Sequence, residues 1–225
     1  MKKKLLIIMI CLLTLSGCTN ITNQNLDNVI STFLTKDMNL SNNVFQGYKY
    51  YIPKGLKLIS KDEYNALLKD ENQNNYYFYI DVVSYYNKTK LNYTTNSSSY
   101  YSKQLNYHDK EGYVEITKAE NSDYYFVEYM YNYGKIEAFI KENDLKSAII
   151  NMSNVLSSLK FNHNILATTI GNKTLNYKED TYNVMKPKGS KATKDTYLNY
   201  EEKYGVYEGY SNKKKDEDKI EIDKD

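Results

Sequence analysis

The segment that most constrains the fold is residues 123–143, DYYFVEYMYNYGKIEAFIKEN, in which two runs rich in aromatic and branched residues flank Asn-Tyr-Gly. Gly134 can supply the positive φ that a tight hairpin turn needs. In the second run Ile136, Ala138 and Ile140 alternate with other residues, which predicts one buried face. The segment therefore predicts an antiparallel hairpin.

A long amphipathic helix is expected directly after the hairpin, with Asn143 or Asp144 as its N-cap. Apolar residues then recur at helical spacing over about four turns: Leu145, Ala148, Ile149, Met152, Val155, Leu156 and Leu159. Because such a stripe needs an apolar partner, we expect this helix to cover the sheet.

Residues 76–86, YYFYIDVVSYY, predict a long strand with two unlike faces. One face should be buried and contains Tyr76, Phe78, Ile80 and Val82. The other should be more solvated and contains Tyr77, Tyr79, Asp81, Val83 and Tyr85.

Other strands are predicted at 45–52, ending before Pro53, at 100–107 and at 112–119. A short helix is predicted near 61–70, because Ser60 and Glu63 have capping-box spacing. Strands that follow one another, rather than alternating with helices, favour an α+β fold. We expect an antiparallel sheet packed, sandwich-like, against a long C-terminal helix and one or two shorter helices.

The expected core domain spans residues 45–162. An amphipathic helix at about 24–36 precedes it, and two positions are open for this helix: docked on the domain, or lying on a membrane surface. Residues 163–210 are expected to form a C-terminal extension with one or two strands and a further helix, and the charged residues 211–225 a disordered tail.

The N-terminus has the organisation of a secretory signal: three lysines at 2–4, an apolar run from Leu5 to Leu15, and small residues before a cysteine. The run is shorter than the ~20 apolar residues that span a bilayer. Leu15-Ser16-Gly17-Cys18 resembles the lipobox of bacterial lipoproteins. This resemblance implies cleavage between Gly17 and Cys18, a diacylglyceryl group on the Cys18 thiol, and an outward-facing location at the cell membrane. The alternatives are an ordinary secretory signal with a chance cysteine, or a short N-terminal anchor.

Composition excludes several classes of function. If residues 1–17 are removed, 27 lysines remain against 28 carboxylates, a formal charge of −1, and the chain contains no arginine. Such a chain lacks the basic excess and the guanidinium groups typical of nucleic-acid recognition. Cys11 and Cys18 are its only cysteines, so the folded part has no disulfide, and we expect His108 and His163 to be surface residues. We expect no metal and no cofactor.

The sequence shows no recognised catalytic pattern: it contains no GxSxG, no GxGxxG and no GxxxxGK[ST]. Its unusual feature is 26 tyrosines against 6 phenylalanines. Tyrosine suits both half-buried strand positions and binding surfaces. The candidate binding surface is Tyr77, Tyr79, Asp81 and Tyr85. The alternative is that the tyrosines are structural and that Asp81 accepts hydrogen bonds from neighbouring Tyr or Lys side chains.

The succession YYIPKG, strands, hairpin, helix and LSSLKF distantly resembles the PsbP/Mog1-like fold over about 120 residues. That resemblance implies an accessory or binding role. We therefore expect a membrane-anchored extracytoplasmic lipoprotein, non-enzymatic, that binds an envelope protein, peptide or glycan through a tyrosine-rich surface. The alternatives are a cell-envelope hydrolase that uses a carboxylate such as Asp81, and an accessory subunit of a transporter or secretion machine.

Overall fold

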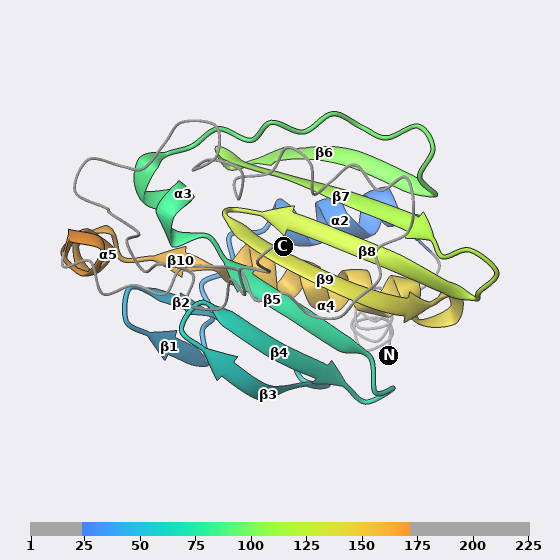
Figure 1. The fold of residues 1–225 in the computed structure, drawn as a ribbon, viewed down its shortest axis with the longest axis horizontal. Coiled ribbons are helices and arrows are strands. Elements are labelled where there is room, and N and C mark those ends of the chain that lie inside the picture. Colours follow the sequence, from blue (N-terminus) through green and yellow to red (C-terminus); the bar gives the residue numbers. More distant parts are fainter. Residues whose placement is uncertain (1–23, 172–225) are drawn as a thin grey trace, which may run out of the picture.

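The structure is a computed structural model and describes residues 24–171. Its main element is a seven-stranded antiparallel sheet with the strand order β3-β4-β5-β9-β8-β7-β6 (Figure 1). The strands are β3 (Leu56–Asp62), β4 (Asn65–Asp70), β5 (Asn75–Ile80), β6 (Tyr101–Tyr107), β7 (Lys110–Lys118), β8 (Tyr124–Tyr131) and β9 (Gly134–Lys141).

A three-stranded antiparallel sheet lies beside it and contains β1 (Asn43–Phe45), β2 (Tyr48–Tyr50) and β10 (Lys160–Phe161), in the order β1-β2-β10. The helices in the described part are α2 (Leu26–Leu34), α3 (Val82–Asn87), α4 (Leu145–Ser158) and α5 (His163–Gly171), with a 3₁₀ turn, η2 (Glu142–Asp144), before α4. Two antiparallel sheets with these helices form the expected α+β, sandwich-like fold. None of the helices in residues 24–171 combines the length and the apolar character that crossing a bilayer requires.

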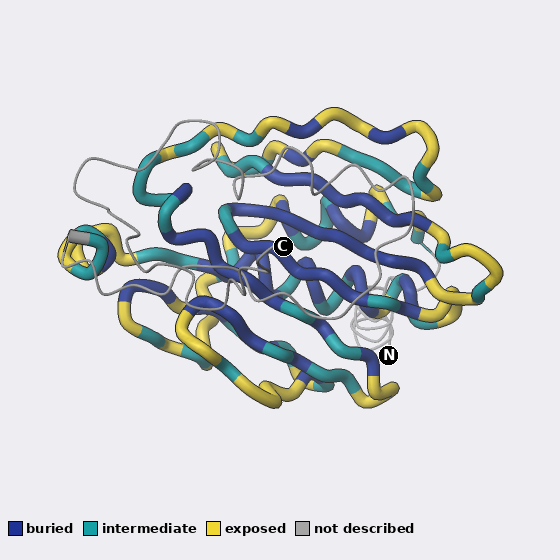
Figure 2. Tube along the Cα trace, in the orientation of Figure 1, coloured by how far each residue is buried: buried dark blue, intermediate teal, exposed yellow. Residues whose placement is uncertain are grey.

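The long helix α4 covers one face of the seven-stranded sheet, and α2 packs against α4 (Figure 1). All seven residues of the predicted α4 stripe are buried, and Figure 2 shows how burial is distributed along the chain. In α2, Val29, Ile30 and Leu34 are at most 1% exposed and belong to the same core as the sheet. Of the two positions open for the helix predicted at about 24–36, the structure therefore shows the one docked on the domain.

The predicted hairpin is β8–β9, and Ile136, Ala138 and Ile140 face the core as expected. The turn differs in one respect: Asn132 (φ 52°) and Tyr133 (φ 62°) adopt the positive φ angles. Gly134 instead begins β9, where a Cβ atom would lie 2.9 Å from both Leu156 Cδ2 and Leu159 Cδ2. The glycine is needed for close packing under α4.

The helix predicted near 61–70 is wrong, because this segment is the β3–β4 hairpin with a turn at Glu63 and Tyr64. Ala66 and Leu68 alternate onto the core face and are 3% and 0% exposed. Strand β4 pairs with β3 on one side and β5 on the other, so sheet hydrogen bonds satisfy the backbone groups that a helix would have paired internally.

The single strand predicted at 76–86 is also wrong beyond Ile80. The last pair of β5 with β9 is Ile80 with Gly134, and the backbone N–H of Asp81 makes one further hydrogen bond of 2.8 Å, to the carbonyl oxygen of Tyr133. Residues Val82–Asn87 form α3 instead, which satisfies their backbone groups locally. The strand predicted at 45–52 is likewise divided, because Gly47 (φ 92°) turns the chain between β1 and β2.

The strand expected immediately after residue 163 is a helix, α5, whose Leu166 is fully buried. The other elements expected at 172–210, the tail at 211–225 and the signal segment lie outside the described residues.

Candidate functional site

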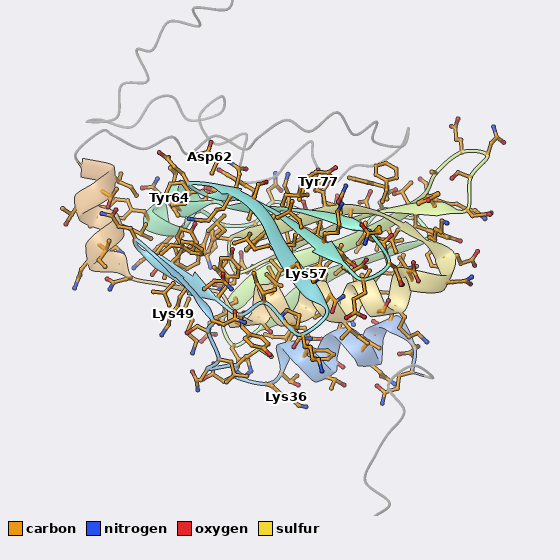
Figure 3. The ribbon with its side chains drawn as sticks, turned by 90° about the horizontal axis from the view of Figure 1, so that it is seen from below. Lys36, Lys49, Lys57, Asp62, Tyr64 and Tyr77 are labelled. Carbon is orange, nitrogen blue, oxygen red and sulfur yellow. The ribbon has the colours of Figure 1, made fainter. Side chains whose placement is uncertain are left out.

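The four residues of the predicted binding surface do not form one exposed surface. Tyr77 is half-buried on the outer face of the sheet, the face opposite α4, and Figure 3 shows it on that side. Tyr79 is 4% exposed. Tyr85 lies on α3, where its ring stacks on Phe161 at a centroid distance of 4.0 Å. Tyr77 lines a cleft.

Asp81 has a structural position that the sequence interpretation missed. It is the N-cap of α3, and its Oδ1 accepts a hydrogen bond of 2.9 Å from the backbone N–H of Ser84. Its exposed fraction is 3%. The carboxylate therefore stabilises the first turn of α3 and is not on the solvated strand face on which it was predicted.

Tyr77 lines a cleft of about 510 Å³ on the outer face of the sheet, at the end where β4 turns into β5. We call it the amide–aromatic cleft. Its lining residues are Asn72, Gln73, Asn74, Asn75, Tyr77, Tyr124, Phe139, Lys141 and Asp144. This volume is within the range of small-molecule sites in proteins.

Strand register brings the aromatic side of the cleft together. Lys141 is paired with Tyr124 across β8 and β9, and its Nζ lies 5.7 Å from the centroid of the Tyr124 ring. Phe139, two residues before Lys141, lies on the same face and packs against Phe126 at 5.1 Å. Because alternate residues of a strand share a face, β9 presents an aromatic ring and a cation in succession.

Hydrogen bonds hold the amide side of the cleft in place. Asp70 accepts from the backbone N–H of Asn74 (2.9 Å), from Asn74 Nδ2 (2.9 Å) and from the Tyr76 hydroxyl (2.7 Å). Asp144 accepts from Asn72 Nδ2 (2.9 Å) and Asn74 Nδ2 (3.3 Å). The β4–β5 turn is thus tied to the start of α4, so this wall of the cleft is ordered before any ligand arrives.

These bonds also explain why the side chain of Asp144 does not cap α4 as predicted. Asp144 does occupy the N-cap position of α4, but its side chain makes no capping hydrogen bond and binds the β4–β5 turn instead. Burial, followed by the hydrogen bond to Asp70, raises the pKa of Tyr76. The Tyr76 hydroxyl therefore stays protonated and serves as a donor to Asp70.

A second group of polar residues lies on the same outer face, next to the cleft. Glu115, Glu128 and Glu137 are directly opposite one another on β7, β8 and β9, and Tyr77 continues the row on β5. We call the three glutamates the carboxylate row. Their exposed fractions are 1%, 0% and 8%, which is unusual for glutamate unless it is paired.

Each glutamate of the carboxylate row has a polar partner. Glu115 accepts from the Tyr93 hydroxyl (2.9 Å) and from Asn96 Nδ2 (3.2 Å). Glu128 accepts from the Tyr113 hydroxyl, and Glu137 forms an ion pair of 3.1 Å with Lys135. Several of the chain's many tyrosines thus serve as buried hydrogen-bond donors and do not contribute to an exposed surface.

His108 and His163 are both exposed, as expected. Within residues 24–171 no three His, Cys, Asp or Glu side chains are grouped so that they could hold a metal ion.

No protein-family model and no curated protein sequence matches this chain.

The cleft residues other than Tyr77 were not singled out in the sequence. Asn72–Asn75 lie just beyond the helix predicted near 61–70, and Tyr124 and Phe139 lie within the predicted hairpin. The one signal in the sequence is the run of four consecutive carboxamide side chains at residues 72–75. Their meeting with Tyr124 and Phe139 depends on the pairing of β5 with β9, which the sequence pattern does not specify.

Proposed function

We propose that this chain is a lipid-anchored extracytoplasmic protein that binds an envelope glycan in the amide–aromatic cleft and does not transform it. A positive head, a short apolar run and Leu15-Ser16-Gly17-Cys18 follow one another in the sequence, and this succession supports the anchor and the outward-facing location.

The observation that carries the choice of ligand is the combination of groups around the cleft. Four adjacent carboxamides offer both donors and acceptors, which match hydroxyl groups. Tyr77, Tyr124 and Phe139 offer ring surfaces on which the apolar faces of a sugar can pack. The one carboxylate, Asp144, is already engaged with two of the amides. An uncharged or weakly anionic polyhydroxyl compound fits this chemistry better than a cationic ligand.

Binding of purified cell-wall glycan fragments, measured by calorimetry, tests the ligand class. Tyr124 is 37% exposed, so Tyr124→Ala removes a ring from the cleft with little effect on the core. We expect it to weaken binding at least about five-fold, the equivalent of ~1 kcal/mol. Tyr100→Ala is the matched control, because Tyr100 is 57% exposed and does not line the cleft.

Equal affinities of wild type and Tyr124→Ala would refute the assignment of the cleft. Absence of binding to every glycan fragment, together with specific capture of one membrane or secreted protein, would instead support an accessory subunit.

The anchor is tested separately with Cys18→Ala. This variant should lose labelling by a radioactive fatty acid and should accumulate as an uncleaved precursor. The wild-type protein should stay with the membrane in high salt, because two acyl chains anchor a protein stably whereas one does so only marginally. Release of wild type by salt alone would contradict lipidation.

A further inference from the structure

The exposed face of the three-stranded sheet combines positive charge with apolar side chains. Val44, Lys49 and Lys160 form one row across β1, β2 and β10, since Lys49 is paired with Val44 on one side and with Lys160 on the other. Val44 is 71% exposed, and Leu40, just before β1, is 59% exposed. We call these four residues the basic sheet face.

The loop after α2 extends this face. Lys160 Nζ binds the side-chain oxygen of Asn39 and lies 3.7 Å from Asp37 Oδ1, which places residues 36–40 beside the sheet. Lys36 is exposed in this loop, and Figure 3 shows Lys36 and Lys49 on the same side of the molecule. Asp37 is the one carboxylate that forms an ion pair with these lysines among the described residues.

We propose that the basic sheet face docks on the anionic lipid surface of the membrane that carries the anchor, an inference that rests on the proposed lipidation of Cys18. Lysines near an anionic bilayer are attracted to it, and exposed apolar side chains such as Val44 and Leu40 can enter the headgroup region.

The short segment between Cys18 and α2 also supports docking on the membrane. Eight residue steps separate Cys18 from Leu26, the first residue of α2. A fully extended chain of that length spans at most about 28 Å. The domain is therefore held close to the bilayer, where even a weak interaction gains from high effective concentration.

Docking in this orientation has a consequence for the binding site. Tyr77 and the amide–aromatic cleft are on the outer face of the seven-stranded sheet, whereas Lys36 and Lys49 are on the side of α2 and β2 (Figure 3). The cleft would open away from the membrane, toward the envelope in which glycan is found.

The test uses the full lipidated chain, reconstituted in vesicles of phosphatidylcholine alone or with 30% phosphatidylglycerol. An environment-sensitive fluorophore is attached at Val44→Cys, and its emission reports whether the face is in contact with lipid. We expect a blue shift on the anionic vesicles, no shift on the neutral ones, and reversal by 0.5 M NaCl, which shortens the screening length.

Lysine variants measured with the same fluorophore test the charge. Lys49→Gln should lower the ratio of docked to undocked protein roughly five-fold, and Lys49→Gln with Lys160→Gln roughly 30-fold. The matched control is Lys57→Gln with Lys69→Gln, which removes a directly opposed lysine pair from β3 and β4. This control should leave the ratio unchanged.

Identical emission on both kinds of vesicle, or an equal loss in the control, would overturn the docking proposal. Failure of the anchor has a different signature: the chain without Val44→Cys would react with the fluorophore at a free Cys18 thiol and would not incorporate into neutral vesicles.

Discussion

The side chain of Asn132, in the β8–β9 turn, donates a hydrogen bond of 2.7 Å from Nδ2 to the backbone carbonyl oxygen of Leu159, at the end of α4. Asn132 is 7% exposed, so this bond is shielded from water. The bond joins the hairpin to the helix that covers it. The same residue adopts a positive φ of 52°, which asparagine tolerates better than most residues.

Two substitutions at Asn132 separate what the hydrogen bond and the positive φ each contribute to stability. Asn132→Gly keeps the positive φ but leaves the Leu159 carbonyl without this donor, and should lower the free energy of unfolding by ~1–3 kcal/mol. Asn132→Ala loses both features and should cost about 1 kcal/mol more. Urea unfolding measures both values. Equal stabilities of the alanine and glycine variants would show that the backbone conformation contributes nothing.

Gly134→Ala should destabilise the protein by ~1–3 kcal/mol, because the added methyl group would meet Leu156 and Leu159 at 2.9 Å and Phe78 at 3.2 Å. Removing one of these neighbours should relieve the crowding. In the double variant Gly134→Ala with Leu156→Ala, the loss should therefore be smaller than the sum of the single losses. A double-mutant cycle by thermal or urea unfolding gives this coupling, and additive losses would contradict the packing argument.

Tyr50 and Tyr76 make a matched pair, since both side chains are fully buried. The Tyr76 hydroxyl donates to Asp70 Oδ2 at 2.7 Å, whereas the Tyr50 hydroxyl has no hydrogen-bond partner among the described residues. Tyr76→Phe should therefore cost ~1–3 kcal/mol, and Tyr50→Phe should be neutral or stabilising by up to ~1 kcal/mol. A clear loss of stability in Tyr50→Phe would indicate a partner for its hydroxyl.

Alkaline pH should unfold the protein through its buried tyrosines. Burial raises the pKa of Tyr129 above its ordinary value of 10.0, and this residue is 0% exposed. Above pH 10 the unfolded chain loses the Tyr129 proton while the folded chain keeps it. The free energy of unfolding should therefore fall as pH rises, by up to ~1.4 kcal/mol per pH unit for each such tyrosine.

Tyr129→Phe removes one of these groups, so its stability should fall less steeply than that of wild type between pH 10 and 11.5. Urea unfolding at a series of pH values measures the two slopes. Parallel slopes would mean that Tyr129 does not contribute to the alkaline transition.

The elements that could be predicted from sequence are those with long, regular patterns. The seven-residue stripe of α4 and the alternation in β9 are each repeated often enough to exclude the other type of element. Residues 61–70 are shorter, and there the capping-box spacing of Ser60 and Glu63 outweighed the alternation of Ala66 and Leu68. After Asp81 the apolar pattern continues with Val82 and Val83, although the pairing of β5 with β9 has ended. The pattern of residues within one segment does not show where the strand that pairs with it begins.

The sequence by itself determined the α+β class, the core faces of α4 and β9, and the N-terminal pattern on which the expected anchor rests, because each depends on residues close together in the chain. The tertiary structure decided the amide–aromatic cleft and the carboxylate row. Asn72 and Phe139 are far apart in sequence, and Glu115, Glu128 and Glu137 belong to three different strands. Their meeting depends on strand order and register, which the packing of the whole sheet under α4 selects.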